Sequence, residues 1–195
     1  MHQGRRGLES TLLERDLIEA VEGRELQVFV QPQFDATSGS MVGGEALSRW
    51  WNARLKCYVS PATFIPLAEK LGLISRIDLF VLETVVREQR SLNLVGADCT
   101  WSTNLSPLTL SDDVIERIRG IEAACGPLPT QLEVEITESA VLSAGVQLVS
   151  TLRSIRELGF GVAIDDFGAG QTSLSHLSNL TGHTFETRSF TDRED

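Results

Sequence analysis

The sequence predicts an α/β protein in which parallel strands alternate with helices that pack outside the sheet. After an opening pair of strands, segments with a helical apolar period alternate with short, mostly apolar segments, and this order is typical of a parallel sheet covered by helices. The length of 195 residues suits one domain with a sizeable core. It is a little short for a complete eight-stranded α/β barrel, which needs roughly 200 to 250 residues.

The first predicted elements are a helix and a hairpin. Residues 12–21 carry leucine, isoleucine and valine at helical spacing among charged residues, which indicates an amphipathic helix. Residues 27–34 and 41–50 have strand patterns. The turn-forming residues 35–40 between them predict that the two strands form a hairpin.

The remaining elements continue the alternation. Predicted helices cover residues 61–70, 78–89, 111–121, 144–158 and 172–180, and predicted strands cover residues 100–105, 132–137 and 161–166. Pro66 predicts a kink or a break in the first of these helices, because proline has no N–H to donate. Ser111 is the predicted cap of the third.

The chain divides into three predicted parts. Residues 1–11 form an N-terminal tail, residues 12–180 form the domain, and residues 181–195 form a divergent polar C-terminal tail. The abrupt shift to polar residues after position 180 favours a frayed tail over a buried strand.

Composition and charge exclude several classes of function. The 17 Lys and Arg residues against 27 Asp and Glu residues give a formal charge of -10, and an acidic surface repels DNA and RNA polymers. The three cysteines contain no CxxC pair, which indicates neither a zinc site nor a disulfide framework. Without a secretory signal or an apolar run approaching ~18 residues, we expect no membrane segment and a cytoplasmic location.

Acidic and amide residues end several of the predicted strands. They are Glu45, Asn104, Glu135, Asp165 and Asp166. Asn104, Glu135 and Asp165 follow one another at steps of 31 and 30 residues, about the length of one β/α unit, so we expect them side by side at the carboxyl ends of the strands. Oxygen-rich sets without His or Cys suit Mg²⁺, Mn²⁺ or Ca²⁺, and paired ions of this kind hydrolyse phosphate diesters.

Structural alternatives exist for these residues. A single Asp at a strand end often caps a helix or forms a turn, and the acidic pair at 112–113 is expected to do only that. Asp165 and Asp166 end a buried strand, where an idle charge is costly, which favours function. The pair Trp50–Trp51 allows either base stacking or packing in the core and its rim. Arg49 allows either a phosphate clamp or an ordinary surface position.

Six motifs together resemble the EAL domain family of cyclic-di-GMP phosphodiesterases. In chain order they are Gln31-Pro32, Glu45-Ala46-Leu47, the run Ser-Pro-Ala-Thr-Phe-Ile-Pro-Leu-Ala-Glu at 60–69, Asn104-Leu105-Ser106, Glu-Ile-Thr-Glu-Ser at 135–139 and Asp-Asp-Phe-Gly-Ala-Gly at 165–170. The resemblance implies a TIM-like (β/α) barrel of EAL type, whose first strand is antiparallel to the rest. It also implies metal-dependent hydrolysis of cyclic-di-GMP to linear pGpG.

The resemblance further implies roles for single residues. The implied metal ligands are Glu45, Asn104, Glu135, Asp165 and Asp166, of which Glu45, Asp165 and Asp166 are also implied to be catalytic. The implied substrate contacts are Gln31, Leu47 and Arg49. Glu138, with Thr172 as its partner, is implied to stabilise the loop after Asp166. The implied cofactors are Mg²⁺ or Mn²⁺ at two sites.

The chain departs from the family pattern after residue 180. The family continues into a strand with a Lys-Ile-Asp motif whose Lys orients the attacking water, whereas Glu186 and Arg188 stand at the matching positions here. We therefore expect an impaired second metal site and a barrel without its final strands, with one sheet edge uncovered. Three functions stay open: the hydrolase, a non-catalytic module that binds the nucleotide or a protein, and an inactive truncated fragment. A homodimer or a partner protein would complete the barrel.

Overall fold

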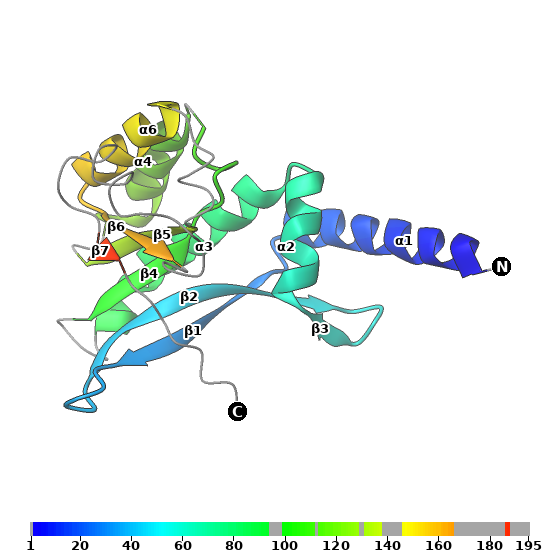
Figure 1. Cartoon of the computed structure of the whole chain (residues 1–195), viewed down its shortest axis with the longest axis horizontal. Coiled ribbons are helices and arrows are strands. Elements are labelled where there is room, and N and C mark those ends of the chain that lie inside the picture. Colours follow the sequence, from blue (N-terminus) through cyan, green and yellow to red (C-terminus); the bar gives the residue numbers. More distant parts are fainter. Residues whose placement is uncertain are drawn as a thin grey trace.

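The computed structural model in Figure 1 describes residues 2–93, 99–111, 113–128, 131–137, 146–165 and 186–187. Its helices are α1 (His2–Glu22), α2 (Pro61–Lys70), α3 (Ile74–Asn93), α4 (Val114–Cys125) and α6 (Val146–Glu157). Its strands are β1 (Gln27–Phe34), β2 (Met41–Asn52), β3 (Cys57–Val59), β4 (Thr100–Asn104), β5 (Leu132–Thr137), β6 (Gly161–Asp165) and β7 (Glu186–Thr187).

One sheet connects all of these strands in the order β1-β2-β4-β5-β6-β7, with β3 paired to β2. Strand β1 runs antiparallel to β2, and each later pair along this path is parallel. The predicted α/β class and the antiparallel first strand are therefore confirmed. Within the described residues the sheet is open, with β1 and β7 at its edges.

Two hydrophobic cores hold the helices against the sheet. In Figure 1, α3, α4 and α6 lie together over β4, β5 and β6, while α1 and α2 gather beside the end of β2 and β3. The first core buries side chains such as Leu82, Ile118 and Ile155, and the second centres on Trp50, whose ring meets that of Phe64 edge to face at 6.1 Å. Each fully buried side chain of this size contributes roughly 1.5–3 kcal/mol.

Several local predictions are corrected by the structure. Helix α2 continues through Pro66, so the predicted break is wrong, while the alternative of a kink stays a prediction. Helix α4 begins at Val114 rather than at 111, and the Ser111 hydroxyl donates to the Asp113 carboxylate at 2.5 Å instead of capping the helix. Strand β3 was not predicted, because three residues carry no readable period. The predicted helix over 172–180 lies outside the described residues.

The C-terminal segment contains a strand that was not predicted. Glu186 and Thr187 form β7, which pairs in parallel with β6 through Ala163 and Ile164. The expectation of a frayed segment is wrong at these two residues, while the boundaries 1–11, 12–180 and 181–195 stay predictions. No helix in the described part of the chain is long and apolar enough to cross a bilayer.

A glycine pair lets β2 approach its neighbours closely. A Cβ at Gly43 would lie 2.2 Å from the Thr100 carbonyl oxygen of β4. A Cβ at Gly44 would lie 2.7 Å from the Trp101 ring and 2.8 Å from Val30. These positions accept only hydrogen, so the register between β2 and β4 depends on them.

We predict that Gly43→Ala destabilises the protein by about 1–3 kcal/mol, because the methyl group collides with backbone that cannot move without parting two strands. Urea unfolding followed by circular dichroism measures this. Gly120→Ala is the matched control, since no atom lies within 4 Å of its Cβ position in α4, and it should gain up to about 1 kcal/mol from helix propensity. Equal midpoints for Gly43→Ala and the wild type would refute the close approach.

Candidate functional site

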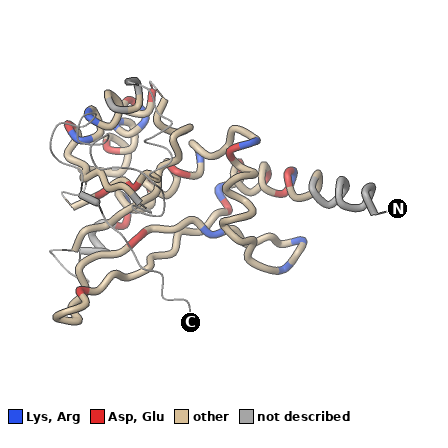
Figure 2. Tube along the Cα trace, viewed as in Figure 1, with Lys and Arg blue, Asp and Glu red and all other residues tan. Residues whose placement is uncertain are grey.

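A cavity of about 570 Å³ lies at the carboxyl ends of β2, β4 and β5, where α2 and α3 approach the sheet. Its size is that of a small-molecule site. The predicted residues on its wall are Gln31, Glu45, Leu47, Arg49, Asn104 and Glu135. Figure 2 shows acidic residues along the strands and basic residues on the loop between β2 and β3.

The strand register brings three of the predicted ligands together. Asn104 at the end of β4 is paired with Glu135 of β5, and the Asn104 side-chain amide donates to Glu45 Oε1 of β2 at 2.6 Å. Glu135 is only 4% exposed. A carboxylate as buried as that of Glu135 is costly without a compensating positive charge, which favours a cation at this place.

The donor chemistry of this cluster fits a hard divalent cation. Glu45, Asn104 and Glu135 offer only oxygen ligands, the type that Mg²⁺ and Mn²⁺ prefer. Among the described side chains, no three His, Cys, Asp or Glu residues form a group that would hold a metal by themselves. The cluster seen here consists of two carboxylates and one amide.

The other predicted acidic residues are placed only in part. Asp165 ends β6 with its backbone paired to Thr137, and its side chain lies outside the described residues. Asp166, Glu138 and Thr172 also lie outside them. Glu133, which sequence analysis did not assign to the site, is buried on the same strand face as Glu135.

The predicted substrate contacts lie beside the carboxylates. Gln31 of β1 pairs with Glu45, and Leu47 and Arg49 follow on the same face of β2. The Arg49 guanidinium donates to the Ser48 carbonyl at 2.9 Å and lies 5.9 Å from the centre of the Phe29 ring. Arg49 forms no ion pair with any described residue, so its charge is available to an anion.

A second polar network was missed by sequence analysis. Asp78 of α3 accepts hydrogen bonds from the Ser106 backbone N–H at 2.8 Å and the Thr109 hydroxyl at 2.6 Å. The Ser106 hydroxyl donates to Glu69 of α2 at 2.8 Å. The loop that follows Asn104 is therefore held by two helices. Asp78 could have been found because it sits at a helical spacing of four from Ile74, on the apolar face of α3.

Burial raises the pKa of Asp78 to about 6, against an ordinary value of 3.8. The hydrogen bonds from Thr109 and Ser106 lower this pKa and the nearby charge of Glu69 raises it, but loss of water is the largest cause. Between these two pKa values the folded state keeps a proton that the unfolded chain has released.

Comparison with known proteins shows a consistent likeness. The profile of one protein family, described as the EAL domain, matches residues 14–184. The bifunctional diguanylate cyclase/cyclic di-GMP phosphodiesterase MucR of Pseudomonas aeruginosa is 35% identical over 175 residues, which are 88% of this chain and 25% of that protein. The cyclic di-GMP phosphodiesterase NbdA of the same organism is 34% identical over 184 residues, 90% of this chain and 22% of that protein.

The fold is shared with solved structures as well. A structure of the MucR phosphodiesterase in complex with c-di-GMP superposes with a TM-score of 0.76 at 35% identity, covering 86% of this chain and 68% of that chain. The present chain spans about a quarter of the length of the curated relatives that it matches.

We predict that Asp78→Asn makes the protein more stable at pH 8 and has little effect at pH 4. The wild-type free energy of unfolding should fall as the pH rises from about 4 to about 6, by at most about 3 kcal/mol for a shift of about 2 pKa units. The variant keeps an oxygen that accepts both hydrogen bonds but carries no charge, so this fall should disappear. Urea unfolding at pH 4, 6 and 8 measures the difference.

The matched control is Asp113→Asn, at an exposed carboxylate whose pKa is lowered, chiefly by the hydrogen bond from Ser111. This control should not gain stability at pH 8. The same dependence on pH in Asp78→Asn and in the wild type would contradict the assignment to Asp78.

Proposed function

Because the chain belongs to the EAL domain family, we propose that it binds cyclic-di-GMP in this cavity and hydrolyses it to linear pGpG with the help of divalent metal ions. The proposal rests mainly on one observation. The Asn104 amide of β4 donates a hydrogen bond to Glu45 of β2 at 2.6 Å, and Asn104 is the strand partner of Glu135 of β5. All three line a cavity that Arg49 also lines.

The residues divide into two groups by what they contribute. Glu45, Asn104 and Glu135, joined by Asp165 and Asp166, supply the oxygen ligands for Mg²⁺ or Mn²⁺ at two sites. When bound, such ions lower the pKa of a water and offset the charge of the phosphate. Glu138 and Thr172 hold the loop that follows Asp166.

The second group binds the substrate. Arg49 offers two parallel N–H donors to a phosphate, while Gln31 and Leu47 contact the rest of the dinucleotide. In the reaction, water adds to one phosphorus and one P–O ester bond breaks. The departing oxygen takes up a proton and the second phosphodiester stays intact, so the product is linear.

A second candidate is a module that binds cyclic-di-GMP without cleaving it. Glu186 favours this candidate, because it is paired with Ala163 of β6, two residues before Asp165, at the position where the family has a lysine. A glutamate at this position adds a negative charge and does not replace a cation that orients water.

Incubation of the 195-residue chain with cyclic-di-GMP and Mn²⁺ separates the candidates, with products resolved by chromatography and binding followed by calorimetry. The hydrolase yields pGpG. Binding without pGpG selects the second candidate, and the absence of binding contradicts both. The predicted homodimer or partner protein stays a prediction, which sedimentation of the same sample would test.

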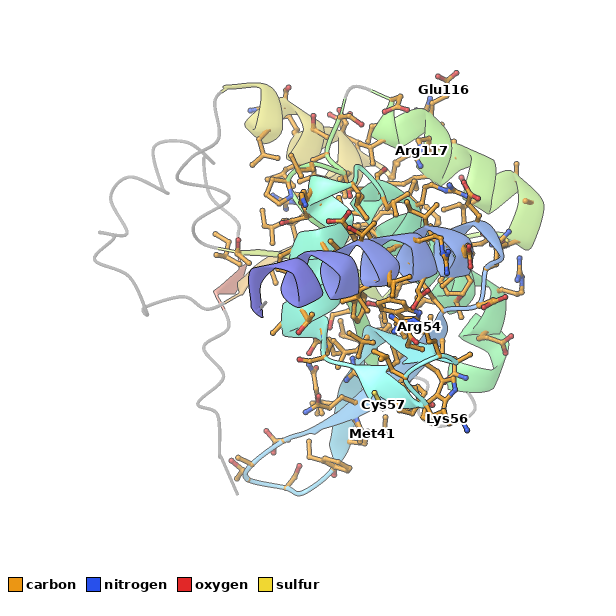
Figure 3. All side chains as sticks on the ribbon, turned by 90° about the vertical axis from the view of Figure 1, so that its right-hand side faces the viewer. Met41, Arg54, Lys56, Cys57, Glu116 and Arg117 are labelled. Atoms are coloured by element: carbon orange, nitrogen blue, oxygen red, sulfur yellow. The ribbon has the colours of Figure 1, made fainter. Side chains whose placement is uncertain are left out.

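We predict that Glu45→Gln lowers the rate of pGpG formation and the affinity for Mn²⁺ by at least about 100-fold, because a neutral amide is a poor replacement for a carboxylate ligand. Initial rates and Mn²⁺ titration measure the two effects. Glu116→Gln makes the same change of charge at an exposed position of α4, labelled in Figure 3, and should leave both unchanged. Wild-type affinity for Mn²⁺ in Glu45→Gln would remove Glu45 from the ligand set.

We also predict that Glu186→Lys speeds hydrolysis by about 10-fold or more, since it removes a negative charge and restores the family's cation beside β6. The initial rate of pGpG formation at saturating cyclic-di-GMP is the measurement. A rate equal to or below that of the wild type would show that Glu186 does not limit the reaction.

A further inference from the structure

Three exposed aromatic rings form a cluster next to the cavity. Phe29 of β1, Trp51 of β2 and Tyr58 of β3 are 46%, 45% and 47% exposed. The rings of Trp51 and Tyr58 lie 5.1 Å apart and those of Phe29 and Tyr58 lie 5.7 Å apart, both edge to face. Clustered apolar groups left in water commonly mark a binding surface.

The cluster continues the face of the sheet that carries the cavity. Leu47, Arg49 and Trp51 alternate along β2 on the same face as Glu45. Phe29 is the strand partner of Leu47, and Tyr58 is the strand partner of Trp51.

The opposite face has a different role. Trp50, the neighbour of Trp51, points into the second core and is 1% exposed. The sequence left both tryptophans ambiguous; in the structure Trp50 lies in the core and Trp51 lies on the surface beside the cavity.

The rings are held in place by their neighbours. The Tyr58 hydroxyl donates to the Gln27 side-chain oxygen at 2.7 Å, and Gln27 is the strand partner of Arg49. The Arg49 guanidinium lies over the Phe29 ring at 5.9 Å. Each edge-to-face contact uses the edge of one ring and one face of the other, so three rings joined by two such contacts keep further faces for another flat group. Figure 3 labels Arg54, Lys56 and Cys57, which mark the loop and strand beside the cluster.

An arginine next to open aromatic rings suits a nucleotide. Two residues along a strand span about 7 Å, so Trp51 is within a nucleotide's reach of a phosphate bound at Arg49. A purine base stacked on an aromatic side chain gains about 1–3 kcal/mol. The cluster contains no carboxylate that would repel the neighbouring phosphate.

We propose that Phe29, Trp51 and Tyr58 form a stacking platform for one guanine base of the bound cyclic dinucleotide, while Arg49 holds the adjacent phosphate. This inference rests on the proposed function, because it assumes that a cyclic dinucleotide occupies the cavity. The rings thereby add affinity for a purine base at a position that the carboxylates do not reach.

The tryptophans provide a direct readout. The chain has three, and Trp50 and Trp101 are 1% and 2% exposed while Trp51 is half-exposed. Of the three tryptophans, a base that stacks on the platform therefore contacts only Trp51. Stopped-flow mixing with cyclic-di-GMP should quench tryptophan fluorescence before turnover, and Trp51→Phe should lose this quenching while it keeps most of the affinity.

Calorimetry with cyclic-di-GMP on the full chain completes the test. Trp51→Ala should raise the Kd by about 5- to 150-fold, which is the stacking energy converted at 1.4 kcal/mol per tenfold. Leu55→Ala is the control: it removes an exposed apolar side chain from the loop between β2 and β3, outside the aromatic contacts, and should keep the wild-type Kd.

The outcomes separate the two proposals. If the wild type binds cyclic-di-GMP but shows no quenching, and Trp51→Ala binds equally well, the platform is refuted while the proposed function stands. If the wild type does not bind cyclic-di-GMP, the proposed function fails and the platform fails with it. A Kd raised in Trp51→Ala but restored in Trp51→Phe supports stacking and excludes a folding defect as its cause.

Discussion

The hydrogen bond between the Asn104 amide and the Glu45 carboxylate is the contact on which the site depends. It joins side chains of adjacent parallel strands at 2.6 Å, and it exists only because β2 and β4 run in a fixed register. Gly43 and Gly44 make that register possible, since any larger residue would meet Thr100 or Trp101. The geometry of a charged site is thus set by two residues that carry no chemistry themselves.

The network around Asp78 lowers the stability of the fold, because it buries a carboxylate. Keeping a carboxylate in a dry position is unfavourable, yet Asp78 and Glu69 use their oxygens to fix the segment that begins immediately after Asn104. A neutral side chain would lose less free energy on removal from water. The charged one makes stronger hydrogen bonds to the backbone N–H of Ser106 and the hydroxyl of Thr109, and so limits the freedom of the loop.

Sequence patterns located the carboxylate cluster because Asn104, Glu135 and Asp165 lie at or near the ends of strands that recur at about one β/α unit. That rule needs only chain spacing, and it placed Asn104 beside Glu135 correctly. It could not reveal Asp78, which lies within helix α3 and not at the end of a strand, nor β3 and β7, which are too short to show a period. It also left Trp50 and Trp51 undecided, because only the packing of the folded chain shows that the Trp50 ring lies in the second core and the Trp51 ring is exposed. The side chains of Asp165 and Asp166 lie outside the described residues, so their assignment still rests on the motif.

Pro32 makes the edge strand β1 less able to pair with a strand of another chain. Strand β1 is an outer strand of the described sheet and exposes Val30 and Phe34, a combination that invites another chain to add itself through backbone hydrogen bonds. Proline cannot donate such a bond, and on an edge strand its ring takes the place of an outward N–H. Pro32, the second residue of the Gln31-Pro32 motif beside the cavity, therefore also interrupts the ladder of hydrogen bonds that a self-associating fibril would require.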